Sequence, residues 1–215
     1  MSQEQTAPQP PPPSASPPSN ITTTSADLPP PIITLPNCIL RLIHPSDAPA
    51  IQRAADSPAV AKYMSYRFAN PYTLEHAQQW VGFATAFKAP GTDILPSFAI
   101  CDPATNTVLG GIGIKARDDV ESNMYEVGYW IGEASWGKGI MTAALRAYVK
   151  WVFETFPAIN RLEGVVFEGN EASGKVLKNA GFVYEGTRRK AAVKHGVVMD
   201  ILVYGLLREE CSLLN

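Results

Sequence analysis

Four stretches of the chain are predicted to be helices, and in the second and third, apolar side chains recur at helical spacing. They are Asp47–Ala55, Thr73–Lys88, Ile140–Thr155 and Glu171–Ala180. Local signals at the ends support these helices. Ser46 is a suitable N-cap for the first, Thr73 and His76 resemble a capping box at the second, and Pro157 lies just beyond the third. The pattern therefore predicts four helices of moderate length.

Shorter apolar runs, rich in β-branched and aromatic residues, predict strands between these helices. The predicted strands are Cys38–His44, Ser97–Cys101, Val108–Lys115, Asn123–Ile131, Arg161–Phe167, Phe182–Ala191 and Val197–Leu206. His195 and Gly196 are typical of a tight hairpin turn between the last two. Strands come first and then alternate with helices, so the order predicts an α/β protein (an α+β mixed sheet) with helices on both faces.

The first 36 residues differ in composition from the rest. They hold 11 of the 19 prolines, many Ser and Thr residues and no aromatic side chain. Such a segment buries too little apolar surface to offset its loss of entropy on ordering. We therefore predict a disordered proline-rich leader, 1–36, followed by one folded domain, 37–215. Pro10–Pro13 has polyproline II character and can dock into an SH3-like groove, although a solvated leader without a partner fits the composition at least as well.

Charge and cysteine content exclude several classes of protein. A net charge of −2 gives no indication of binding to nucleic acid or to an anionic membrane. The three cysteines and three histidines are scattered, which predicts no metal site and no disulfide framework. The sequence contains no bilayer-spanning apolar run and no secretory signal. We therefore expect a cytoplasmic protein, and the sequence leaves its oligomeric state open.

The segment Tyr129–Met141 is the part of the sequence most indicative of chemistry. An apolar strand runs into a lysine bracketed by Gly137 and Gly139, and a helix starts there. Backbone N–H groups and a helix N-terminus directed at one point suit a phosphate or pyrophosphate. Gly132–Lys138 also spells most of a nucleotide-binding P-loop, but the next residue is a glycine where that loop needs Ser or Thr. An ordinary strand–turn–helix junction is the other alternative.

A second motif, Asn170–Phe182, follows a predicted strand. Together the two motifs resemble the GNAT superfamily of N-acetyltransferases, most closely the branch that acetylates the N-termini of ribosomal proteins (RimJ/RimL-like). The resemblance covers about Leu35–Glu210. Features of that branch recur in the Leu40-Arg41 opening with Asp47, in Pro71-Tyr72-Thr73 with Ala77 and Trp80, and in the ending Tyr204-Gly205-Leu206-Leu207.

The resemblance implies the GNAT fold, a mostly antiparallel mixed sheet, and acetyl-CoA as co-substrate. It implies a strand edge that pairs with pantetheine and then a loop that holds the pyrophosphate. The residues concerned are Tyr129, Trp130, Ile131, Trp136, Gly137, Lys138, Gly139, Ile140, Met141, Asn170 and Ser173. Trp136 and Met141 depart from the common loop pattern, and a side chain as large as that of Met141 must point away from the phosphates. For Lys138, a solvated surface position is an equal alternative.

The resemblance also implies the catalytic groups. Ser173 is the candidate acid for the thiolate, since Leu177 stands where many relatives carry a tyrosine. Glu126 is the candidate base, acting on the amine through a water; the alternatives are a solvent-facing role for Glu126 and a base at Glu133. Asn170 is equally well explained as the N-cap of the next helix.

The acceptor is predicted less directly. Tyr129, Asp200 and Tyr204 are the candidate residues for binding it, and 62–72 and 194–197 are the candidate walls of its groove. We expect a protein or peptide α-amine as acceptor. A small-molecule amine and a non-catalytic acyl-CoA-binding module remain the alternatives.

Overall fold

The computed structural model describes residues 28–214, which form eight strands and five α-helices. The strands are β1 Ile33–Leu35, β2 Cys38–Leu42, β3 Phe98–Cys101, β4 Val108–Ala116, β5 Met124–Ile131, β6 Arg161–Phe167, β7 Val183–Lys194 and β8 Val197–Leu207. The helices are α1 Ala48–Ala55, α2 Pro58–Ala61, α3 Leu74–Ala86, α4 Ile140–Thr155 and α5 Glu171–Asn179. Short 3-10 turns lie at Pro45–Asp47, Asp119–Glu121, Glu133–Ser135 and Arg208–Glu210.

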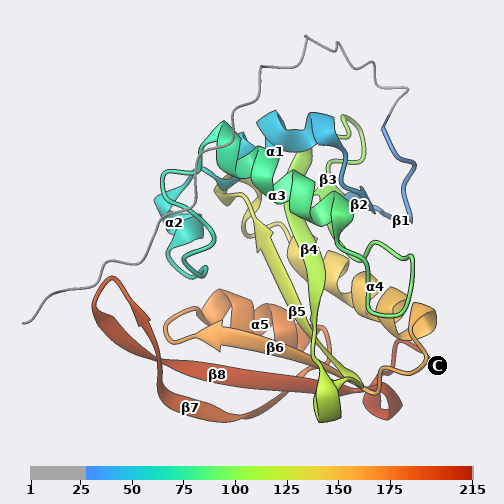
Figure 1. Ribbon diagram of the computed structural model, residues 1–215, viewed down its shortest axis with the longest axis vertical. Coiled ribbons are helices and arrows are strands. Elements are labelled where there is room, and N and C mark those ends of the chain that lie inside the picture. Colours follow the sequence, from blue (N-terminus) through green and yellow to red (C-terminus); the bar gives the residue numbers. More distant parts are fainter. Residues whose placement is uncertain (1–27, 215) are drawn as a thin grey trace, which may run out of the picture.

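All eight strands belong to one mixed sheet, in the order β1-β2-β3-β4-β5-β6-β8-β7. Every neighbouring pair is antiparallel except β5 and β6, which are parallel. Figure 1 shows β5 and β6 starting side by side and then separating along their length. This separation splits the sheet into two wings and provides the position for the site described below.

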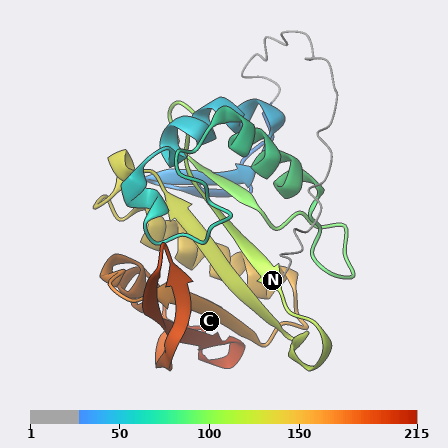
Figure 2. The same ribbon diagram turned by 60° about the vertical axis from the view of Figure 1, so that its left-hand side comes forward.

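Helices cover both faces of the sheet, as the sequence pattern predicts. Helices α1 and α3 pack on one face, and α4 and α5 pack on the other (Figures 1 and 2). We call these the α1/α3 face and the α4/α5 face. Side chains alternate along each strand, so neighbouring residues of β5 point to opposite faces.

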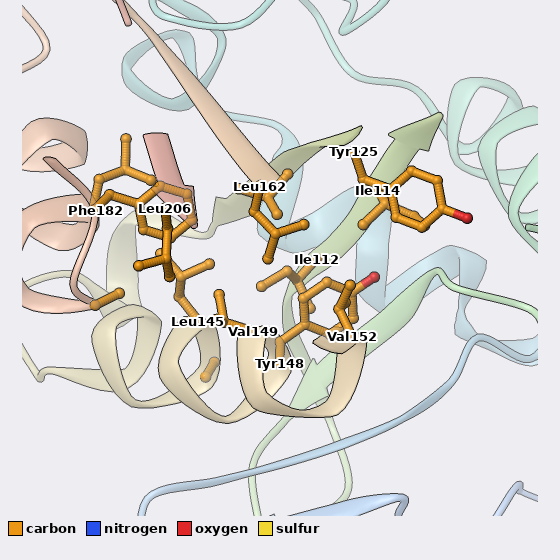
Figure 3. Packing of buried hydrophobic residues seen from close by; sticks show 14 of the residues in the cluster. Ile112, Ile114, Tyr125, Leu145, Tyr148, Val149, Val152, Leu162, Phe182 and Leu206 are labelled. Carbon is orange, nitrogen blue, oxygen red and sulfur yellow. The ribbon is translucent and has the colours of Figure 1, made fainter. Parts of the chain in front are cut away.

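The larger core lies on the α4/α5 face. Leu145, Tyr148, Val149 and Val152 of α4 are fully buried and point at the strands (Figure 3). Their spacing is the helical spacing seen in the sequence, so the amphipathic pattern of 140–155 is explained by this contact. Truncating one such side chain costs about 2–5 kcal/mol of stability.

A smaller apolar cluster on the α1/α3 face surrounds a buried ion pair. Arg41 of β2 is 0% exposed, and its guanidinium binds both carboxylate oxygens of Asp47 at 2.8 Å. Asn106, from the β3–β4 turn, accepts a third hydrogen bond from the same guanidinium at 2.8 Å. Leu40-Arg41 and Asp47, which carry part of the family resemblance, therefore join β2 to the start of α1.

The structure confirms most of the predicted elements. The bounds of α4 and β6 agree with prediction to the residue, and the Thr73–His76 capping box is present at α3. The predicted N-cap at Ser46 is wrong. Pro45–Asp47 forms a 3-10 turn before α1, His44 caps that turn, and the backbone N–H of Ser46 donates to His44.

Two short elements near the N-terminus were not predicted. Ile33–Leu35 forms β1, which pairs with β2, although it lies inside the segment expected to be disordered. The strand has only three residues, and the prolines on both sides of it dominate the composition of the segment. The prediction of disorder is therefore wrong for Ile33–Leu35. Residues 1–27, with Pro10–Pro13, lie outside the described residues. The other missed element is α2, a single turn capped by the Ser57 hydroxyl.

Candidate active site

The site is built around the gap between β5 and β6. The two strands pair only at Met124–Glu126 and Arg161–Glu163. Beyond this point β6 continues along β8, whereas β5 continues along β4. The edge of Gly128–Ile131 that faces away from β4 is therefore left without a strand partner. A free strand edge can accept an extended, amide-containing ligand.

Gly128 makes this edge accessible. It is exposed in the middle of β5, and a Cβ added there would meet no atom within 4 Å. The two side chains that follow it point to opposite faces. Tyr129 packs with the core of the α4/α5 face, whereas Trp130 packs on the other face and contacts Phe68. The predicted alternation of Tyr129 and Trp130 across the sheet is confirmed.

The glycine loop lies at the end of the same strand. Gly137 and Gly139 have φ values of 73° and 72°, in the left-handed region that glycine tolerates best. A Cβ at either position would meet nothing within 4 Å, so the loop surface is open. The indole N–H of Trp136 donates to the Ile131 carbonyl at 2.8 Å and fixes the start of the loop. Lys138, between the glycines, is exposed.

Helix α4 begins directly after this loop, with Gly139 as its N-cap and no side-chain cap. Its first N–H groups therefore have no side chain of the helix to bind, and they carry the positive end of the helix dipole. Ile140 and Met141 are 6% exposed and point into the core. Both contribute backbone to the loop surface, and the side chain of Met141 does not obstruct it. These features fit the pyrophosphate of a CoA-type ligand.

Helix α5 brings a second set of groups to the gap. The side chain of Asn170 caps the helix by accepting the N–H of Ser173 at 3.2 Å. The hydroxyl oxygens of Ser173 and Tyr129 lie 3.0 Å apart, so a hydrogen bond joins α5 to β5. The Tyr129 hydroxyl also lies 3.3 Å from the Ser173 carbonyl. Burial raises the pKa of Tyr129 to about 12, and the bond to Ser173 opposes part of that rise.

Leu177 has a packing role at the position where many relatives carry a tyrosine. It is 1% exposed and lies against Gly164 of β6, where a Cβ would come within 2.9 Å or less of its methyl groups. Helix α5 thus sits close on β6 because a glycine faces a leucine. Tyr204 of β8 is buried on the same side, with its hydroxyl against Gly174 of α5.

Tyr204 and Asp200 are the predicted acceptor-binding residues of β8, and in the structure both have partners within the protein. Both lie on the α4/α5 face of β8, because strand residues two or four apart share a face. Asp200 binds the backbone N–H of Lys190 at 2.7 Å and so stabilises the bulge of β7. Lys190 itself has a φ of 52°. Asp200 therefore has a structural partner, and Tyr204 belongs to the α5 interface.

Glu126 lies on the α1/α3 face of β5, within a network of charges. Its two oxygens pair with Lys115 at 2.8 Å and Arg117 at 2.9 Å. Arg117 also reaches Glu163, the register neighbour of Glu126 on β6, at 3.2 Å. The side chain of Glu126 is 13% exposed. Arg117 thus separates two carboxylates that would otherwise repel each other, and its Nε is buried without a hydrogen-bond partner among the described residues.

The two predicted walls of the acceptor groove meet. The Nζ of Lys194, at the tip of the β7–β8 hairpin, donates to the carbonyls of Ala61, Lys62 and Met64. The hydroxyl of Tyr66 accepts the N–H of His195 at 2.6 Å. Figure 2 shows the hairpin tip reaching the α2 turn. Burial lowers the pKa of Lys194. The loop after α2 and the hairpin therefore form an arch on the α1/α3 face.

Several residues of the site were not predicted from the sequence. Lys115 and Arg117 were missed, although a register for the β4–β5 hairpin would have placed Lys115 beside Glu126. Lys194 and Tyr66 lie in the predicted walls, but no local signal identifies their partners, which are about 130 residues away. Glu133, the alternative base, accepts a hydrogen bond from the Ser57 hydroxyl at 2.7 Å and lies before the glycine loop.

The divided sheet, free strand edge and glycine loop are the arrangement expected of an acetyltransferase. The comparisons with known proteins agree. The profile described as acetyltransferase (GNAT) domain matches residues 37–183, which is more than half of the chain. The chain therefore belongs to the GNAT acetyltransferase family, and it is an acetyl-transferring enzyme. Of the helices in residues 28–214, none is long and apolar enough to cross a membrane.

The chain is also similar to individual relatives named as N-acetyltransferases and to solved structures that share its fold. The chain is 28% identical to N-acetyltransferase p20 of Bacillus licheniformis, named uncharacterized, over 80% of this chain and 93% of that protein. It is 36% identical to a Bacillus subtilis protein provisionally named ribosomal N-acetyltransferase YdaF, over 48% of this chain and 56% of that one. The ribosomal-protein-S5-alanine acetyltransferase of Vibrio fischeri superposes with a TM-score of 0.69 at 23% identity, over 84% of this chain and 98% of that one.

Proposed function

We propose that this chain transfers the acetyl group of acetyl-CoA to the α-amine of a protein or peptide. The observation that carries the proposal is the free edge Gly128–Ile131 beside an open glycine loop and the uncapped start of α4. A bound acetyl-CoA would supply the acetyl group as a reactive thioester. Solved relatives include a RimL structure in complex with coenzyme A and an MccE structure with acetyl-CoA and AMP.

In this proposal each face of the sheet has its own task. The backbone N–H groups from Trp136 to Met141 hold the pyrophosphate, and an N–H of the β5 edge donates to the carbonyl oxygen of the acetyl group. One such donor is typically worth about 2.7–4 kcal/mol in the transition state. Ser173 gives a proton to the departing sulfur. Glu126, on the opposite face, accepts the proton of the amine through a water and passes it to solvent.

The basicity of the acceptor favours an α-amine. The pKa of a protein N-terminus is about 7.7–8.0, whereas that of a lysine side chain is about 10.4. Both oxygens of Glu126 are engaged by cations, so fewer of the acceptor sites of this carboxylate are free to bind a water. An amine that is already partly neutral at pH 7 needs less help from such a base.

A small-molecule amine is the second candidate, and the arch between the α2 loop and the hairpin favours it. Lys194 joins the two walls, which restricts the groove on one side. A small amine fits a restricted pocket, while a peptide needs an open slot. The closed arch and the ribosomal-protein relatives therefore point to different acceptors.

Release of the CoA thiol from acetyl-CoA, measured with an acceptor panel, tests the proposal. The panel contains N-terminal peptides, Nα-blocked lysine peptides, free amino acids and polyamines. Release with free N-termini alone would support the proposal, and release with small amines alone would favour the second candidate. No thiol release with any acceptor, while acetyl-CoA still binds, would indicate a non-catalytic binding module.

Variants at the catalytic candidates separate an enzyme from a binding module. Glu126→Gln and Ser173→Ala should each lower kcat while the Kd of acetyl-CoA stays within about twofold. Proton transfer by a positioned side chain contributes roughly 10²–10⁴-fold, which sets the range expected for Glu126→Gln. An unchanged kcat in Glu126→Gln would remove Glu126 from the mechanism.

A further inference from the structure

The hydrogen bond between Tyr129 and Ser173 is a contact that the proposed mechanism does not yet use. Tyr129 projects from β5 and Ser173 from the first turn of α5, and their hydroxyl oxygens are 3.0 Å apart. These two elements flank the gap between β5 and β6. The bond therefore spans the place where the free strand edge meets α5.

Serine has one hydroxyl hydrogen, and its direction decides what the group can do. If Ser173 donates to Tyr129, its hydrogen is taken and cannot reach a ligand. If Tyr129 donates to Ser173, the serine oxygen is satisfied as an acceptor and its hydrogen is free to point into the gap. The alternative acceptor for the Tyr129 hydrogen is the Ser173 carbonyl, at the longer distance of 3.3 Å.

We propose that Tyr129 is a positioning residue, which donates its hydroxyl hydrogen to Ser173 Oγ and thereby directs the Ser173 hydrogen at the sulfur of CoA. The proposal rests on the proposed acetyltransferase function. When the amine nitrogen bonds to the acetyl carbon, the carbon–sulfur bond breaks and the electron pair stays on sulfur. Ser173 protonates that sulfur and is itself reprotonated from water, while the amine proton leaves through Glu126. Tyr129 keeps its proton throughout.

The surroundings of Tyr129 suit a donor that does not ionise. The residue packs against the apolar core of the α4/α5 face, and the neutral phenol is the form that such surroundings favour. Strand β5 is paired with β4 from Tyr125 to Ile131, which holds the backbone of Tyr129 in place. Tyr125 provides a natural comparison. It lies four residues earlier on the same face of β5, is 4% exposed and packs against Phe156.

The first test is a double-mutant cycle in the full chain. Tyr129→Phe removes only the hydroxyl and should lower kcat by roughly tenfold, the worth of one well-placed hydrogen bond. The KM for acetyl-CoA should stay within about twofold. Ser173→Ala should lower kcat further, and adding Tyr129→Phe to it should have no additional effect. Tyr125→Phe is the matched control and should leave kcat unchanged.

Two kinetic outcomes would overturn the proposal. Independent effects that multiply in the double variant would show that Tyr129 does not act through Ser173. A raised KM for acetyl-CoA at an unchanged kcat would make Tyr129 a binding group instead. Circular dichroism of each variant checks that the fold is retained.

A second measurement needs no acceptor and so separates this proposal from the proposed function. The thiolate absorbance of bound CoA is titrated against pH on the wild type, Tyr129→Phe, Ser173→Ala and Tyr125→Phe. A hydrogen-bond donor aimed at the sulfur lowers the pKa of the bound thiol. Tyr129→Phe and Ser173→Ala should both raise that thiol pKa, and Tyr125→Phe should not.

The outcomes of this titration are distinct. A response with no turnover on any amine would support the positioning role while refuting the acetyltransferase function. Turnover on peptides with an identical thiol titration in all four proteins would refute the positioning role alone. Failure of the wild-type chain to bind CoA would refute both.

Discussion

The two faces of the sheet are built differently. On the α4/α5 face, an apolar core supports a site made largely of backbone, with left-handed glycines, a free strand edge and the start of a helix. On the α1/α3 face, a smaller apolar cluster is joined by polar contacts between distant segments, such as Arg41–Asp47, Arg117–Glu163 and Lys194 with the α2 turn. In the proposed function, the first face holds the CoA-type ligand and the second receives the acceptor. Backbone geometry would then bind the CoA-type ligand, and side-chain contacts would shape the site of the acceptor.

The largest expected effect concerns the stability of the α1/α3 face. Asp47→Asn removes the charge that compensates the fully buried Arg41. Breaking a buried pair in this way costs about 3–5 kcal/mol, because one charge is left buried and uncompensated. Urea unfolding of the wild type and variant measures the loss.

Asp93→Asn is the matched control for that experiment. Asp93 is 95% exposed and pairs with Lys88 at the surface, where an ion pair contributes about 0–1 kcal/mol. Similar losses in the two variants would contradict the distinction between a buried and a solvated pair. They would also show that the apolar cluster alone holds α1 to the sheet.

The second prediction tests the backbone site on the α4/α5 face. Gly139→Ala should raise the Kd of acetyl-CoA roughly tenfold, because a left-handed conformation costs an L-residue about 1–2 kcal/mol and the altered loop no longer directs its N–H groups at one point. Isothermal titration calorimetry measures the change. The same strain lowers the unfolding free energy by a similar amount.

Gly91→Ala separates the loss of binding from the loss of stability. Gly91 has a φ of 71° and open space around its Cβ position, as Gly139 does, but it lies in the loop after α3. It should lose stability without losing affinity for acetyl-CoA. Equal affinity in the two variants would argue against the glycine loop as the pyrophosphate site.

The elements that sequence predicts well depend on local signals, whereas the contacts that it misses join distant segments. The bounds of α4 and β6, the turn at His195-Gly196 and the cap at Asn170 follow from periodicity and local chemistry. The family resemblance supplied the roles of the glycine loop. The face on which Asp200 and Tyr204 lie depends on strand register, which one sequence does not determine. Lys194 was placed in a wall of the groove, but its partners in α2 could be found only from the folded chain.

The third prediction concerns the arch and has a smaller effect. Lys194→Met removes the donor that holds the hairpin to the α2 turn. Hydrogen bonds from a charged group contribute about 1.5–3 kcal/mol when buried, and partial exposure reduces this, so we expect roughly a fivefold rise in the acceptor KM. Lys190→Met, on the same hairpin, is the control. A fall in the acceptor KM would show that the arch blocks a peptide, and the KM for acetyl-CoA should not change in either variant.

The last prediction is a pH dependence, confined to high pH, that links stability to the α4/α5 face. Burial raises the pKa of Tyr129 to about 12 in the folded protein, against about 10 in the unfolded chain. The unfolded chain therefore releases this proton first, and the stabilisation present below pH 10 is lost as the pH rises from about 10 to 12. The Tm of the wild type should fall more steeply over this range than that of Tyr129→Phe, in which the group is absent. Equal slopes would mean that Tyr129 titrates as an exposed phenol does, and the buried donor assigned to it would then be wrong. Since Tyr125→Phe keeps Tyr129 intact, its profile shows how much of the slope comes from Tyr125, whose pKa burial also raises.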